Sequence, residues 1–128
     1  MTRLALPIRT ARLLLRDFAP EDFAAIHSYA SDPEVTRFMF YGPRDEADTG
    51  AYLVRMLESQ AEHPRLTWEL AVVESDSGAL IGACDLTLEN EREADLGYIL
   101  GRAWWGRGYA SEAAAAMVRA GFEQLGCD

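Results

Sequence analysis

The stretch from residue 101 to residue 113 places two glycines between a strand pattern and a helix pattern. Residues 96–100 alternate and are mostly apolar, while residues 113–118 are rich in alanine, so the order is strand, turn and helix. Gly106 and Gly108 allow a tight turn and leave room for a ligand. The first amides of a helix lack intrahelical partners, and its dipole favours an anion there. The stretch therefore predicts a phosphate site, although a bare Gly-x-Gly can equally be only a sharp connection.

The turn does not follow the common nucleotide-binding motifs, which need a third glycine or a Gly-Lys-Ser/Thr sequence. The sequence Trp105-Gly106-Arg107-Gly108-Tyr109-Ala110 instead resembles the acetyl-CoA pyrophosphate loop of the GNAT acyltransferases, usually written Gln/Arg-x-x-Gly-x-Gly/Ala. Trp105 departs from that general pattern. However, Trp-Gly-x-Gly-Tyr-Ala-Ser/Thr-Glu-Ala, present here from Trp105 to Ala113, is similar to the RimJ/RimL-like branch, which acetylates protein N-terminal amines and some small-molecule amines.

The N-terminal part carries a second resemblance to the same branch. It has the pattern Thr-x-Arg-Leu-x-Leu-Arg at residues 10–16, followed by Glu21-Asp22, and Asp32-Pro33-Glu34-Val35 ahead of Arg37. In that branch, the first helix and the turn after it often help to shape the acceptor site. The resemblance covers residues 10–125.

Periodicity predicts four strands and three helices. The strands are expected at residues 8–16, 67–74, 79–88 and 93–100, and the helices at 20–31, 45–62 and 108–125. The last three strands follow one another through short turns and predict an antiparallel meander. The resemblance implies an α+β, GNAT-like fold with a mainly antiparallel sheet, in a single domain over residues 1–128.

GNAT enzymes continue past the loop helix with a further strand, a helix and a closing hairpin. Here the sequence stops at Gly126-Cys127-Asp128, where that strand should begin. We therefore expect a C-terminally incomplete fold, truncated before the fifth strand. An open strand edge tends to recruit another chain, so we expect either a fragment of a longer protein or a homo-oligomer in which a partner covers the gap.

Charge and composition exclude several classes of partner. A net charge of −9 argues against nucleic acid or an anionic membrane and suits a cationic acceptor. No apolar run is long enough to span a bilayer, and the start is too short for a secretory signal, so we expect a cytoplasmic protein. Cys84 and Cys127 lack metal or disulfide spacing, and His27 and His63 lie near neither, so no metal is expected.

The resemblance implies that acetyl-CoA is the co-substrate and assigns it to the loop and the strand before it. Backbone amides around the end of that strand would polarise the thioester carbonyl. Arg102 and Arg107, which flank the loop, and Arg119, on the helix after it, would attract the anionic cofactor despite the acidic net charge. The alternative is that all three are ordinary solvated surface residues. The expected acetyl-CoA contacts are Ile99, Leu100, Arg102, Trp105, Gly106, Arg107, Gly108, Tyr109, Ala110 and Ser111.

Attack of an amine on the thioester needs a free lone pair, so a carboxylate that accepts a proton is a candidate catalytic group. The candidates are Glu69, Glu93 and Asp95, each of which could equally be a solvated strand residue. Strand alternation places Glu93 and Asp95 on one face and Tyr98 on the other, where we expect it in the core. Two other functions stay open: a CoA-binding regulatory module without turnover, and a non-catalytic α+β interaction domain.

Large aromatic residues gather at two further places. Phe38-Met39-Phe40-Tyr41 precedes a Gly-Pro turn and could be core or line an acceptor pocket. Trp104 and Trp105 stand directly before the glycines and could pack or shield the loop. Both alternatives stay open for each group.

Overall fold

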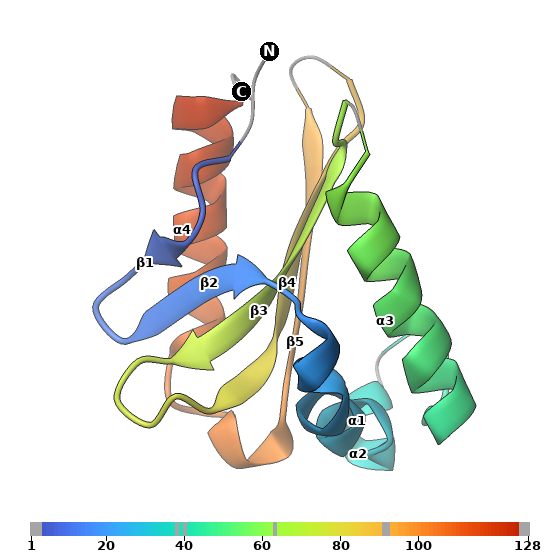
Figure 1. The fold of residues 1–128 in the computed structure, drawn as a ribbon. Helices are drawn as coiled ribbons and strands as arrows, with labels where there is room; N and C mark the ends of the chain where they lie inside the picture. Colours follow the sequence, from blue (N-terminus) through green and yellow to red (C-terminus); the bar gives the residue numbers. More distant parts are fainter. Residues whose placement is uncertain (1–3, 38, 40, 63, 91–92, 126–128) are drawn as a thin grey trace.

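The computed structural model describes residues 4–37, 39, 41–62, 64–90 and 93–125. Its centre is an antiparallel sheet in the order β1-β2-β3-β4-β5 (Figure 1). The strands are β1 (Ile8–Arg9), β2 (Leu13–Asp17), β3 (Thr67–Glu74), β4 (Leu80–Leu88) and β5 (Ala94–Leu100). The helices are α1 (Phe23–Ala30), α2 (Pro33–Thr36), α3 (Glu46–Gln60) and α4 (Tyr109–Gln124), with short 3₁₀ turns at Pro20–Asp22 and Arg102–Trp104.

The second half of the sequence forms the elements that its periodicity predicts. The strands expected at 67–74, 79–88 and 93–100 agree with β3, β4 and β5 to within one residue, and they pair as a meander. The helices expected at 45–62 and 108–125 agree with α3 and α4 to within two residues. The helix expected at 20–31 is a 3₁₀ turn followed by α1, and α2 is an additional short helix.

The sheet has one strand more than the sequence predicted. Residues 8–16 were expected to form a single strand, but a turn at Thr10 separates β1 from β2. The Thr10 amide donates to the Leu13 carbonyl, and the Leu13 amide donates to the Thr10 hydroxyl, both at 2.9 Å. The chain therefore reverses, so that Ile8 pairs with Leu15. The prediction of a fold truncated before a fifth strand is wrong, because the described residues form five strands.

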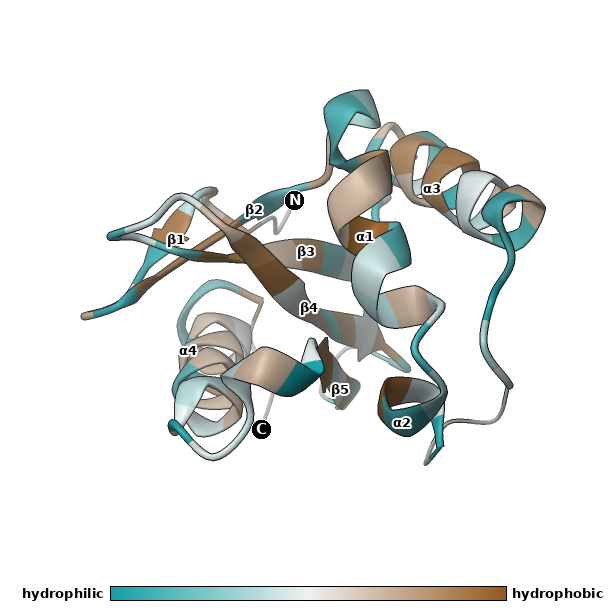
Figure 2. Cartoon of the chain, turned by 90° about the horizontal axis from the view of Figure 1, so that it is seen from below, coloured by the Kyte–Doolittle hydropathy of each residue, from teal (hydrophilic) through white to brown (hydrophobic). Residues whose placement is uncertain are grey.

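Helices cover both faces of the sheet. Figure 2 shows α4 on one side and α1 and α3 on the other, with hydrophobic residues on the strands between them. In β3, Trp68, Leu70 and Val72 lie in the cluster that includes α4, whereas Ala71 and Val73 lie in the cluster that includes α1 and α3. Burial on both faces explains why β3 runs apolar rather than alternating along its second half. No helix in the described part of the chain is both long and apolar enough to cross a membrane.

Tyr98 corrects one expectation about the core. It lies on the face of β5 opposite Asp95, as strand alternation predicted, but 55% of its surface is exposed. The reason is its position: β5 is an edge strand within the described residues, and no described neighbour covers Tyr98 on its open side.

Candidate functional site

The turn between β5 and α4 adopts left-handed backbone conformations at both of its glycines. The φ angle is +74° at Gly106 and +81° at Gly108, a region that residues with a Cβ atom rarely adopt. Gly108 is the N-cap of α4, and no side chain caps this end of the helix. The first amides of α4 are therefore available to a ligand. They border a pocket of about 310 Å³ lined by Tyr98, Leu100, Trp104, Trp105, Gly106, Gly108, Tyr109, Ala110 and Ser111.

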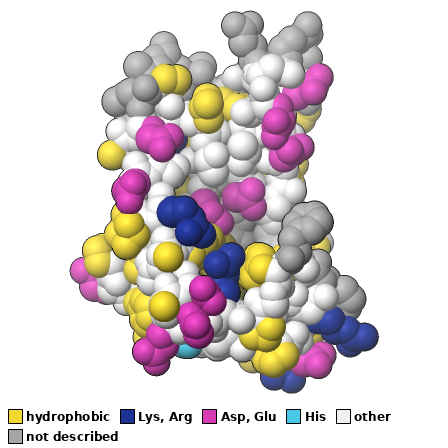
Figure 3. All heavy atoms as spheres, turned by 90° about the vertical axis from the view of Figure 1, so that its right-hand side faces the viewer, with side chains coloured by type: hydrophobic (Ala, Val, Ile, Leu, Met, Phe, Trp, Pro, Cys, Tyr) yellow, Lys and Arg dark blue, Asp and Glu magenta, His cyan; other side chains and the backbone are white. Residues whose placement is uncertain are grey.

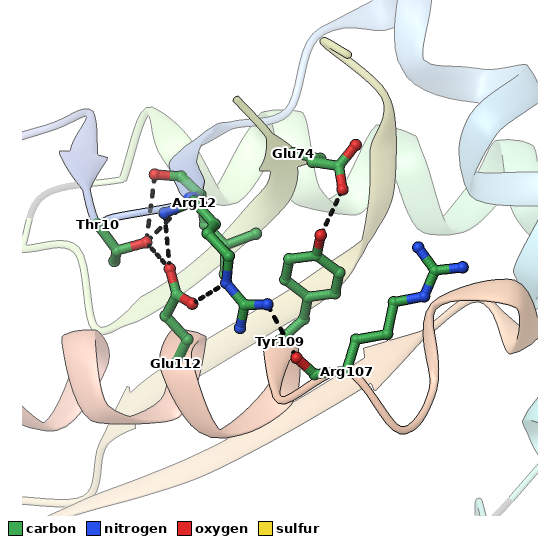
Figure 4. A network of polar contacts seen from close by, with 7 residues as sticks. Thr10, Arg12, Glu74, Arg107, Tyr109 and Glu112 are labelled. Carbon is green, nitrogen blue, oxygen red and sulfur yellow. Dashed lines mark hydrogen bonds and ion pairs between the residues drawn. The ribbon is translucent and has the colours of Figure 1, made fainter. Parts of the chain in front are cut away.

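Arg12, in the turn between β1 and β2, contacts both this loop and the first turn of α4 (Figure 4). Its Nη1 donates to the carbonyl of Arg107 at 2.9 Å, and its Nε donates to Glu112 at 2.7 Å. Its guanidinium also lies 4.3 Å from the centre of the Tyr109 ring. The Thr10 hydroxyl donates to the same carboxylate. The loop conformation thus depends on groups 95 to 102 residues earlier in the chain.

The Glu112 carboxylate connects α4 to the turn between β1 and β2. Burial raises the pKa of Glu112, but hydrogen bonds from Thr10 and Arg12 outweigh burial and leave that pKa below its ordinary 4.5. Because folding lowers this pKa, the ionised carboxylate stabilises the fold above the ordinary value, and the stabilisation is lost as the pH falls through the lowered pKa.

We therefore expect Glu112→Gln to lower the free energy of unfolding by about 1 kcal/mol at pH 7, and by less in acid. Urea unfolding at the two pH values measures the difference. Glu123→Gln, at an exposed position on the same helix, is the control and should change little. An equal loss at both pH values would contradict the explanation from ionisation.

The three arginines expected near the phosphate site have different surroundings. Arg102 donates to both oxygens of Asp32, each at 3.1 Å, and so connects the loop to the N-cap of α2. Arg107 is exposed beside the loop, with its guanidinium 5.3 Å from the Trp104 ring centre. Arg119 lines a different pocket, between β1 and α4. Of the three, Arg107 is therefore the cation that the structure leaves beside the glycine turn.

Within the described residues β5 has an open edge, and this edge lies next to the loop. The Gly101 amide donates to the Ile81 carbonyl in β4 at 2.8 Å. Amides alternate between the two sides of an antiparallel strand, so the amide of Ile99 faces β4, and those of Tyr98 and Leu100 face the open edge. Of the two residues expected to present a polarising amide, Leu100 has the orientation for it.

Trp105 joins this edge to the glycine turn. Its indole Nε1 donates to the Leu100 carbonyl at 3.0 Å, and 44% of its surface stays exposed. Trp105 lines a second pocket of about 360 Å³, together with Val35, Met39, Tyr98, Ile99 and Leu100. Met39 belongs to the aromatic segment that the sequence singled out; Phe38 and Phe40 lie outside the described residues. Tyr41 is partly exposed beneath Arg44, whose guanidinium is 3.9 Å from its ring centre.

Carboxylates gather on the sheet face that α1 and α3 cover. Glu69 of β3 pairs across strands with Asp85 of β4, and Asp85 pairs with Gly97 of β5. The Tyr52 hydroxyl donates to Glu69. Burial raises the pKa of Glu69 in spite of that hydrogen bond, and burial together with Asp95 raises the pKa of Asp85. Seen from the α3 side, acidic and basic side chains meet near the middle of the molecule (Figure 3).

The three predicted carboxylates do not share one environment. Glu69 is half-buried, whereas Glu93 and Asp95 are exposed. Asp85 was not among the predictions, although the sequence holds a signal for it. It is a charged residue inside the otherwise apolar strand pattern of residues 79–88, where aspartate is disfavoured.

The cysteine that the structure describes does not belong to this site. Cys84 is a free, buried thiol, and burial raises its pKa to about 12. A thiol with so high a pKa is unreactive at neutral pH. Cys127 and His63 lie outside the described residues.

A family model described as an acetyltransferase (GNAT) domain matches residues 12–128. The chain belongs to the GNAT acetyltransferase family. It is 35% identical over 124 residues to the uncharacterized N-acetyltransferase p20 of Bacillus licheniformis, a match that covers 91% of this chain and 66% of p20. It is also 30% identical over 119 residues to the uncharacterized N-acetyltransferase YnaD of Bacillus subtilis strain 168, covering 92% of this chain and 66% of YnaD.

A solved GNAT structure agrees with the fold. The crystal structure of a GNAT-family acetyltransferase from Bacillus anthracis superimposes with a TM-score of 0.79 at 27% sequence identity, covering 92% of this chain and 67% of that one. The chain thus spans about two thirds of the length of these three GNAT relatives.

Proposed function

We propose that this chain carries an acetyl-CoA-dependent N-acetyltransferase activity that moves an acetyl group to a primary amine. The observation that carries the proposal is the left-handed turn at Gly106 and Gly108, which opens the N-terminus of α4 beside an open strand edge. The sequence from Trp105 to Ala113 supports an assignment to the RimJ/RimL-like branch of the family.

The loop fits the diphosphate of acetyl-CoA. A Cβ atom added at Gly106 would meet no heavy atom within 4 Å, so the space beside this glycine is open. The amides of Tyr109, Ala110 and Ser111 would hold the diphosphate, and Arg107 would add positive charge. Arg102, held by Asp32, would keep the loop in place.

The edge of β5 would hold the pantetheine arm. Acetyl-CoA supplies the acetyl group as a thioester when it is bound. The outward amide of Leu100 would donate to the thioester carbonyl and stabilise the negative charge that develops on its oxygen. Trp105 and the side chain of Ile99 would line the apolar part of the same groove.

The reaction is direct attack. The ammonium of the acceptor loses one proton, and the freed nitrogen forms a bond to the carbonyl carbon. The nitrogen then loses its second proton as the carbon–sulfur bond breaks and the thiolate leaves. An α-amine, with a pKa near 8, gives up the first proton more readily than a lysine amine, with a pKa of about 10.4. A protein N-terminus or a small-molecule amine is therefore the proposed acceptor, and Glu69, Glu93 and Asp95 are the carboxylates proposed from the sequence to take the proton.

Two measurements on the same chain test the proposal. Calorimetry should detect acetyl-CoA binding, and thiol release should accelerate with a panel of small primary amines and N-terminal peptides. Binding without release by any amine would leave a CoA-binding module without turnover. Absence of binding would contradict the proposal and leave an interaction domain.

A further inference from the structure

Asp85, in β4, places its carboxylate against β5, one strand away from the proposed thioester. Its strand partner is Gly97, and a Cβ atom built on Gly97 would lie 2.5 Å from Asp85 Oδ1. The Asp85 carboxylate therefore occupies the space that any other side chain at position 97 would fill. Gly97 is followed directly by Tyr98, whose amide faces the open edge.

Asp85 has no counter-charge among the residues that the structure describes. No hydrogen-bond donor or cation among the described residues pairs with it, although it is half-buried. Burial and the nearby Asp95 both raise its pKa. Glu69, by contrast, accepts a hydrogen bond from Tyr52, and the positive charge of Arg44 favours its ionised form. A half-buried carboxylate that is left without a donor is poised to accept a proton.

A second polar group in the same layer also lacks a partner. Tyr29, on α1, is 3% exposed, and among the described residues its hydroxyl has no hydrogen-bond partner. Burial raises the pKa of Tyr29, and the negative charge of Glu69 raises it further. Tyr29 belongs to the same hydrophobic cluster as Ala83, which lies two residues before Asp85. Buried hydroxyls are normally paired, so this one points to a polar ligand between α1 and the sheet.

From these positions we propose that Asp85 is the catalytic group that takes the proton from the acceptor ammonium, and that Gly97 is the residue that makes room for it. The inference rests on the proposed acetyltransferase activity. One ammonium proton passes to an Asp85 oxygen, and the freed nitrogen bonds to the carbonyl carbon. As the carbon–sulfur bond breaks, the second proton leaves the nitrogen and the thiolate takes up a proton. Asp85 then releases its proton to solvent, so each turnover yields one amide, one thiol and one proton.

Asp85→Asn is the decisive variant. With an amine that the wild type acetylates, kcat/KM at pH 7.5 should fall at least about 100-fold, as for loss of a general base. Acetyl-CoA affinity by calorimetry should stay within about two-fold, and Tm should rise because an unpaired, half-buried charge is removed. Unchanged turnover in Asp85→Asn would overturn the inference, as would lost turnover together with a lowered Tm.

Gly97→Ala tests the same contact from the other strand. The added methyl should displace the carboxylate and lower kcat/KM about ten-fold, but should cause no further loss in the Asp85→Asn background. Additive losses in the double variant would contradict the shared role.

Two further measurements distinguish Asp85 from the other candidate carboxylates and test the proposed activity itself. A 100-fold loss in Asp95→Asn or Glu69→Gln, with Asp85→Asn active, would move the base to that residue. A wild type that binds acetyl-CoA but acetylates no amine would overturn the proposed activity, and this inference with it.

Discussion

Gly108→Val abolishes acetyl-CoA binding, if the diphosphate sits on the loop as proposed. Gly108 has a φ of +81°, which a β-branched residue adopts only with strain, so the turn must change shape. A Cβ atom at this position would also come within 3.4 Å of Arg12 Nη2, and Arg12 is the side chain that holds the Arg107 carbonyl. Calorimetry should find no binding at concentrations that saturate the wild type, while far-ultraviolet circular dichroism changes little.

Gly78→Val is the matched control for this variant. Gly78 has a φ of +74° in the turn between β3 and β4, and a Cβ atom there would meet nothing within 4 Å. Its backbone strain should cost about 1–3 kcal/mol of stability without affecting acetyl-CoA affinity. If Gly108→Val folds and binds acetyl-CoA as tightly as the wild type, the loop does not hold the diphosphate.

Gly82→Ala should lower the free energy of unfolding more than the same change at Gly97 or Gly101. A Cβ atom on Gly82 would lie 2.1 Å from the Ile99 carbonyl oxygen and 2.9 Å from the Leu100 Cα. Both atoms are backbone, so β4 and β5 must separate at the point where the loop begins. We expect a loss of about 3 kcal/mol or more, measured by urea unfolding.

Gly50→Ala should change the free energy of unfolding in the opposite direction. Gly50 lies inside α3, and the nearest atom to an added Cβ is a side-chain carbon of Phe23 at 3.8 Å, an ordinary contact. Alanine should therefore raise the free energy of unfolding by about 1 kcal/mol through helix propensity alone. A neutral Gly82→Ala, measured beside this control, would mean that β4 and β5 do not approach as closely as the structure indicates.

The elements that the sequence predicted well are those whose signal is local. β3, β4, α3 and α4 each bury one face or both, so apolar spacing along a few turns or a few strand residues is enough to define them. β5 is exposed or half-buried except at Leu100, but it keeps the alternating pattern and follows β4 through a short turn. The one missed strand has a local cause as well. Ile8 and the leucines at 13, 14 and 15 lie on either side of Thr10, so the whole segment resembles one apolar strand. The turn depends on the Leu13 amide donating to the Thr10 hydroxyl, a contact that apolar spacing does not reveal.

The candidate site divides in the same way. The sequence by itself determined the glycine turn and the open start of α4, because both follow from residues that adjoin in the chain. Only the tertiary structure decided that Arg102 pairs with Asp32, that Arg12 supports the loop, and that Asp85 rests on Gly97. These contacts join residues that are 12 to 95 positions apart in the sequence. Strand register and helix packing bring the residues together, and a local sequence pattern does not specify which charged groups will become neighbours in this way.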